Sequence, residues 1–123
     1  MALGAATITV PVNAVNKVLK RIDSGTPYAS EYHLKEATQS FTLYIRHSKS
    51  KATASKKSVD FHNMELVQTV FATATTPEVV RRAFITVGND YFDSSVDIGY
   101  VSKALTDTLN AAGNTDDFLS WVS

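Results

Sequence analysis

If the segment from Phe61 to Glu78 begins as an extended strand, several of its polar side chains lie on one face. With a period of two, one face carries Phe61, Asn63, Glu65 and Val67, and the other carries Met64, Leu66 and Val70. Asn and Glu are uncommon inside strands. An amide and a carboxylate two residues apart, beside an aromatic ring, could hydrogen-bond and stack unpaired bases. A solvated outer sheet face is the alternative interpretation.

A second polar face follows from the preceding strand, which is the clearest amphipathic segment of the chain. Its inward residues are Phe41, Leu43 and Ile45, and its outward residues are Thr42, Tyr44, Arg46 and Ser48. The segment 48–58, SKSKATASKKS, reads as a hairpin tip with the lysines Lys49, Lys51, Lys56 and Lys57. These lysines could contact phosphate, although loop tips of this composition are usually only solvated.

No set of residues predicts catalysis. His33, His47 and His62 have no evident nucleophile partner, and the chain has neither a GxSxG elbow nor a phosphate loop. We therefore expect no enzyme and no required cofactor. Asp90, Asp93 and Asp97 could hold a structural calcium ion, although helix caps and solvated acids explain the same cluster.

Composition indicates one domain of 123 residues that is globular and not disordered. No apolar run is long enough for a membrane span, and no signal peptide is visible. Residues 1–57 carry nine basic and three acidic side chains, whereas residues 58–123 carry three basic and nine acidic ones. If the two halves form different faces, the basic face would suit a polyanion; the halves could equally neutralise each other by packing.

The elements that position these residues are strands first and helices last. Strands are expected at 7–12, 15–22, 31–37, 41–48 and from 61 onward, which gives a sheet over residues 6–74. Thr75 and Glu78 match a capping box, so a helix is expected from 76 to 88. A second helix follows Ser94 or Ser95, and a last turn presents Phe118 and Trp121, so helices would occupy 76–122. The fold class is α+β, an antiparallel sheet with helices packed on one face.

Several short motifs together resemble the coat proteins of single-stranded RNA bacteriophages of the levivirus type, most closely those of the Caulobacter phage branch. The motifs are MALG at 1–4, TIT at 7–9, KVLKRI at 17–22, SEYHL at 30–34, RH at 46–47, HN at 62–63 and PEVVRRA at 77–83. They span most of the chain in one register.

The resemblance implies a non-enzymatic capsid protein that forms an intertwined homodimer. Dimers would close into an icosahedral virion shell in the host bacterial cytoplasm, with genomic single-stranded RNA on the inner sheet face and no membrane partner. The resemblance also implies possible repression of translation through an RNA hairpin. Asn63 and Glu65 match RNA-facing positions of the family, and Phe61 stands where relatives use a stacking tyrosine. A cellular RNA-binding homodimer without a shell is the alternative function.

Overall fold

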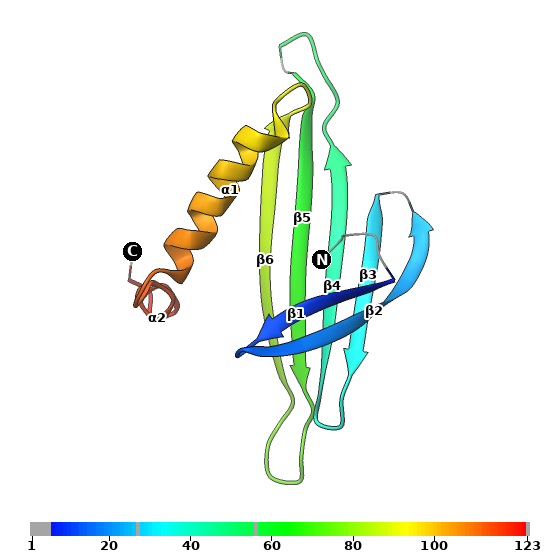
Figure 1. The fold of residues 1–123 in the computed structure, drawn as a ribbon, viewed down its shortest axis with the longest axis vertical. Helices are drawn as coiled ribbons and strands as arrows, with labels where there is room; N and C mark the ends of the chain where they lie inside the picture. The colour runs from blue at the N-terminus through cyan, green and yellow to red at the C-terminus, as the bar shows by residue number, and fades with distance from the viewer. Residues whose placement is uncertain (1–5, 27, 56, 123) are drawn as a thin grey trace.

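The computed structural model describes residues 6–26, 28–55 and 57–122, with side chains omitted for 23–26. Six strands form one antiparallel sheet in the order β1-β2-β3-β4-β5-β6, and two helices follow (Figure 1). The strands are β1 (Thr7–Val12), β2 (Val15–Thr26), β3 (Ala29–Lys35), β4 (Gln39–Lys49), β5 (Val59–Val70) and β6 (Val79–Asp90). The helices are α1 (Ser95–Asn110) and α2 (Asn114–Leu119). This arrangement confirms the α+β class with two C-terminal helices.

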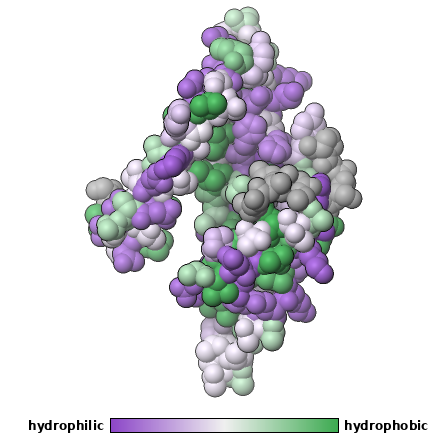
Figure 2. Space-filling view, in the orientation of Figure 1, coloured by the Kyte–Doolittle hydropathy of each residue, from purple (hydrophilic) through white to green (hydrophobic). Residues whose placement is uncertain are grey.

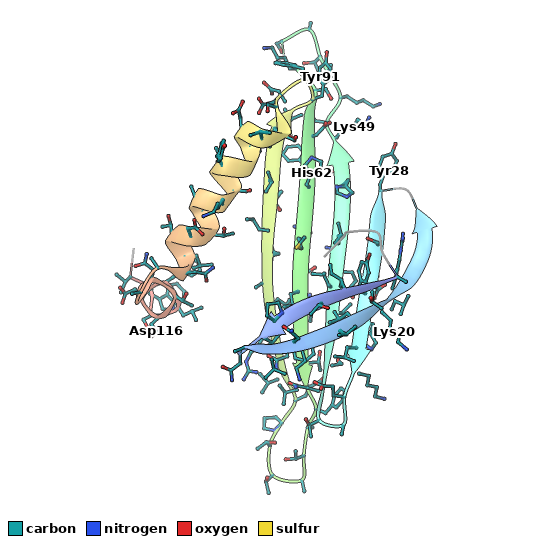
Figure 3. All side chains as sticks on the ribbon, in the orientation of Figure 1. Lys20, Tyr28, Lys49, His62, Tyr91 and Asp116 are labelled. Atoms are coloured by element: carbon teal, nitrogen blue, oxygen red, sulfur yellow. The ribbon has the colours of Figure 1, made fainter. Side chains whose placement is uncertain are left out.

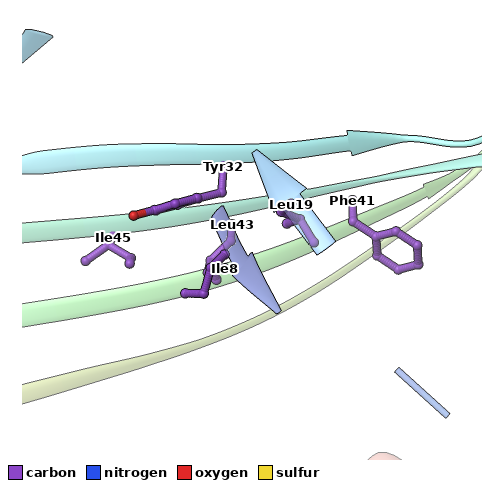
Figure 4. Close-up of a cluster of buried hydrophobic side chains, with 6 residues drawn as sticks. All are labelled: Ile8, Leu19, Tyr32, Phe41, Leu43 and Ile45. Carbon is purple, nitrogen blue, oxygen red and sulfur yellow. The ribbon is translucent and has the colours of Figure 1, made fainter. Parts of the chain in front are cut away.

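The core lies where the β1–β2 hairpin crosses one face of the longer strands (Figure 1). The hairpin turns at Asn13 and Ala14, whose φ angles of 51° and 61° are those of a tight turn that follows strand twist. Irregular pairing after Arg21 bends β2 over the sheet. The buried side chains are Ile8, Leu19, Tyr32, Phe41, Leu43 and Ile45 (Figure 4). We call this side of the sheet the core face.

The helix expected at 76–88 is wrong, because these residues form strand β6. β6 pairs with β5 along its whole length, from Val70 opposite Val79 to Val59 opposite Asp90. The capping-box residues instead form a hairpin turn, in which Thr73 Oγ1 accepts from the amide of Thr76 at 3.1 Å. Valines, isoleucine and threonine in the segment favour extended backbone, and pairing with β5 outweighs the local helix signal. The sheet therefore extends to residue 90, not 74.

The helices leave the sheet at the end of β6 and bury none of their own residues. Ser94 caps α1 by accepting from the amides of Val96 and Asp97, which decides between the two serines that the sequence offered as the start of this helix. α1 runs beside β6 and then meets α2, and neither helix has a buried residue. Tyr100, Leu105 and Phe118 are exposed, and Trp121 after α2 is 95% exposed. Within the described residues, no helix is both long and apolar enough to cross a membrane.

An apolar strip remains open between the helices and the hairpin. A pocket of about 340 Å³ is lined by residues of β1, β4, β5 and β6 together with Leu109 of α1. A second pocket of about 420 Å³ lies between β6 and the two helices. Figure 2 shows apolar residues along this strip. The sheet of one chain thus leaves much of its core face uncovered.

Candidate nucleic-acid interface

The second face of the sheet, opposite the core, gathers most of the predicted polar residues. Strand registers bring three rows together on it. These rows are Thr42, Tyr44, Arg46 and Ser48 on β4, Phe61, Asn63, Glu65 and Val67 on β5, and Arg82, Phe84, Thr86 and Gly88 on β6. We call these twelve residues the platform. In the described part of the chain no second layer covers it, since the hairpin core packs on the other side.

Arg46 is the centre of a polar network on the platform. Its Nη1 donates to Asn63 Oδ1 at 3.2 Å and to Glu65 Oε1 at 3.1 Å. Its guanidinium carbon lies 4.5 Å from the centre of the Tyr44 ring, within cation–π range. The Arg46 side chain is 47% exposed, so part of its donor fork stays open to solvent. Arg46 is therefore held in place while it remains available to a ligand.

Asn63 and Glu65 are engaged by neighbouring protein groups. Asn63 Nδ2 donates to Thr86 Oγ1 of β6 at 3.0 Å. Glu65 Oε2 lies 3.6 Å from Arg82 Nη1, and the Glu65 side chain is only 14% exposed. One carboxylate thus stands between two arginines that are much more exposed. The geometry indicates that Glu65 positions Arg46 and Arg82, which present the outward positive charge.

Aromatic rings lie along the same platform. Phe61 packs over Gly88, where an added Cβ would stand only 3.0 Å from the ring. This glycine therefore leaves room for the ring to lie against β6. Phe84 is 70% exposed; strand register assigns it to the platform, and it also lines both apolar pockets. Exposed rings beside arginines are the arrangement on which single-stranded bases stack.

The predicted lysines do not join the platform. Lys49 pairs with Asp60 and lies on the core face by strand alternation (Figure 3). Lys51 and Lys57 belong to the loop after β4, and the Lys57 ammonium lies 5.0 Å from the centre of the Phe92 ring. Lys56 lies outside the described residues. The sequence grouped these lysines with Arg46, whereas the structure separates them from it.

The three candidate calcium ligands fall at the junction of β6 and α1. Asp90 ends β6, the amide of Asp93 donates to the carbonyl of Asp90, and the amide of Asp97 donates to Ser94. Across the described residues, no three His, Asp or Glu side chains lie close enough together to hold a metal ion. The calcium site stays a prediction.

Sequence reasoning missed Arg82, Phe84 and Thr86. The cause was the helix assigned to 76–88, which removed these residues from the sheet. A period-two reading of β6 would have found them, since Arg82, Phe84 and Thr86 alternate with Ala83 and Ile85. The β-branched residues of the segment were the available signal.

Comparison with known proteins places this sheet among phage coat proteins. Residues 5–90 match the family model described as "Phage phiCb5, coat protein". No curated protein matches the chain. A solved structure titled "Virus-like particle of bacteriophage AVE019" aligns with a TM-score of 0.71 at 10% identity, covering 98% of this chain and 97% of that one. "Virus-like particle of bacteriophage ESE058" aligns with a TM-score of 0.67 at 14% identity, covering 97% and 96%.

The solved structures share the fold, and the family model covers more than half of the chain, including all six strands. Both findings agree with the sequence-based resemblance and with a structural, non-enzymatic protein. The chain belongs to the phage phiCb5 coat-protein family.

Proposed function

We propose that this coat protein forms a homodimer and that the dimers assemble into a closed shell around single-stranded RNA. The observation that carries the proposal is that the two faces of the sheet differ. One face leaves an apolar strip and exposed helices uncovered, and the other presents held arginines beside exposed rings.

The self-association part rests on β6 and the helices. β6 is an edge strand of 12 residues whose outer backbone groups have no neighbouring strand in the described chain. An open edge of this length invites pairing with another strand. A second copy that pairs along β6 would bring its own α1 and α2 over the uncovered apolar strip. Exposed Leu105, Phe118 and Trp121 would then become buried.

The RNA part rests on the platform. Arg46 and Arg82 would contact phosphate or base edges, while Phe84 and Phe61 would stack on unpaired bases. Asn63 and Glu65 would act mainly by holding the arginines, because their polar atoms already have partners on the sheet. Lys51 and Lys57, which belong to the loop after β4, would add positive charge beside the sheet.

Electron microscopy of the protein expressed in bacteria, combined with extraction of its nucleic acid, tests the proposal. Closed particles that contain RNA are expected, and a β6 edge variant with Ile85→Lys should give soluble protein without particles. A stable dimer that binds RNA but never forms a shell would favour the alternative, a cellular RNA-binding homodimer. Assembly would take place in the bacterial cytoplasm.

We also propose that the platform represses translation by binding one RNA hairpin. It requires the platform to select one RNA over others, which base-edge contacts and stacking provide and phosphate contacts do not. Selection of hairpins from a random pool against the wild type and Asn63→Ala tests it. A wild-type pool without any enriched hairpin would remove the repressor role and leave the capsid role intact.

A further inference from the structure

A pair of histidines on the core face is not used by the platform. His47 of β4 and His62 of β5 stand directly opposite each other, and both are exposed. Their Nδ1 atoms are 2.8 Å apart, and the ring centres are 5.1 Å apart with an interplanar angle of 70°. His62 is visible on β5 in Figure 3, between the middle of the sheet and the Lys49 end.

Backbone geometry explains why the two rings meet. The amide of His47 donates to the carbonyl of Tyr28, toward β3 and away from β5. His47 and His62 therefore form a non-hydrogen-bonded antiparallel pair, the kind in which opposite side chains come closest. Two β-strands of a rigid sheet thus fix both imidazoles at short range before any ligand arrives.

From this geometry we propose that His47 and His62 form a two-imidazole site for a divalent transition-metal ion of the copper(II) or nickel(II) class. Imidazole nitrogen binds such ions at about 2.0–2.1 Å. Two nitrogens bound at a right angle then stand about 2.9 Å apart, and at a tetrahedral angle about 3.3 Å apart. The observed 2.8 Å matches the right angle of square-planar or octahedral coordination, with water in the remaining positions.

The surroundings are compatible with this chemistry. Along the core face, the pair Ile45 and Met64 lies on one side of the histidines, and the pair Lys49 and Asp60 lies on the other. The two charges of that second pair offset each other, so this pair adds no net charge beside the histidines. On the other neighbouring strand, Val87 of β6 lies directly beside His62. The metal would be held by two protein ligands, fewer than the three or more of a closed structural site.

Binding requires a proton rearrangement within the pair. In the free pair one Nδ1 donates its hydrogen to the other, so only one Nδ1 lone pair is available. When the metal binds, the donor ring shifts its proton to Nε2, and both Nδ1 lone pairs point to the ion. A proton shared as imidazolium is released to solvent. Because protons and the metal ion compete for the same imidazole lone pairs, binding should weaken as pH falls.

Titration of the metal-stripped full chain with CuCl2, NiCl2 or ZnCl2 by calorimetry tests the site. One Cu²⁺ per chain is expected, with affinity in the order copper, nickel, zinc, and at least a tenfold loss between pH 7.5 and pH 5. His47→Asn and His62→Asn should each lower copper affinity at least tenfold. His33→Asn is the matched control and should bind like the wild type, because His33 lies on β3 and contacts Thr42.

Thermal unfolding of the metal-free variants shows whether they fold. If they do not, electron paramagnetic resonance of the wild type with one equivalent of Cu²⁺ still decides, since two nitrogens should split the signal. Equal copper binding by the wild type and both variants, or a signal without two nitrogens, would overturn the site. The readout needs neither RNA nor particles, so failure here is distinct from failure of the proposed function.

Discussion

Replacing Glu65 by Gln tests the arrangement of the platform, because this change removes one negative charge and little volume. Glu65 accepts from Arg46 at 3.1 Å and lies 3.6 Å from Arg82. If Glu65 serves to hold the two arginines, the neutral amide should release one of them to RNA. Bulk RNA binding should then become stronger, whereas a base-reading Glu65 would give weaker binding on replacement.

The size of the effect follows from counterion release. Each additional phosphate contact to single-stranded RNA steepens the dependence of log affinity on log salt by about 0.7. Between 50 and 200 mM salt, one extra contact per chain adds about a 2.6-fold loss of affinity. The fold should change little, because exposed ion pairs contribute about 0–1 kcal/mol to stability.

Fluorescence anisotropy with a labelled RNA of mixed sequence, measured at several salt concentrations, provides the assay. Asp60→Asn is the matched control, since it makes the same charge change on the same strand but on the core face. Glu65→Gln should steepen the salt dependence and Asp60→Asn should not. An unchanged or shallower slope for Glu65→Gln, or equal slopes for both variants, would refute the positioning role.

Three further predictions concern stacking, acid stability and association. Phe84→Ala should weaken RNA binding by about 1–3 kcal/mol through lost stacking, while Phe92→Ala, an exposed ring away from the platform, should not; equal losses in binding assays would contradict this. The Lys17 ammonium and then the Gln39 amide hold the pKa of the Glu36 carboxyl below its ordinary value of 4.5. This contribution to the free energy of unfolding is present above pH 4.5 and is lost as pH falls through the lowered pKa of the folded state. Lys17→Met should therefore make the free energy of unfolding less dependent on pH between pH 5 and 3. A pH dependence as steep as that of the wild type would contradict the assignment. The thermal midpoint should rise with protein concentration if dimer and fold form together, and a constant midpoint for a folded monomer would exclude an obligate dimer.

The sequence predicted the sheet where hydrophobic alternation was strict. Phe41, Leu43 and Ile45 were assigned to the core and are buried there. A helix was predicted to begin at Ser94 or Ser95, and α1 begins there with Ser94 as its cap. In these segments local preference and tertiary structure agree, so the residue pattern alone was sufficient.

The error at 76–88 came from a segment that satisfies two periods at once. Val79, Val80, Ala83, Phe84 and Val87 fit a helical stripe, and the TTPE sequence fits a cap. Pairing with β5 decides the conformation of this segment. That pairing depends on residues up to 31 positions earlier in the chain, which a local sequence pattern does not include.

The site was predicted only in part for the same reason. Thr42, Tyr44, Arg46, Phe61, Asn63 and Glu65 were placed on one face by alternation, and strand registers bring them together. Asn63 and Glu65 also contact β6, through Thr86 and Arg82. These contacts could not be predicted while residues 76–88 were assigned to a helix. Lys49 lies four residues after Ile45 on β4, so period-two alternation places both on the core face. The prediction had grouped Lys49 with Arg46 by charge instead.

Closure of this chain into an RNA-containing shell by self-association is the proposal that joins the sheet edge, the helices and the platform. Cryo-electron microscopy of particles purified from expressing bacteria, with nuclease-protected RNA measured in the same fraction, tests it most directly. We expect closed isometric particles in which β6 of one chain pairs with β6 of another and the platform faces protected RNA. Soluble dimers without particles, or shells whose platform faces outward, would contradict it.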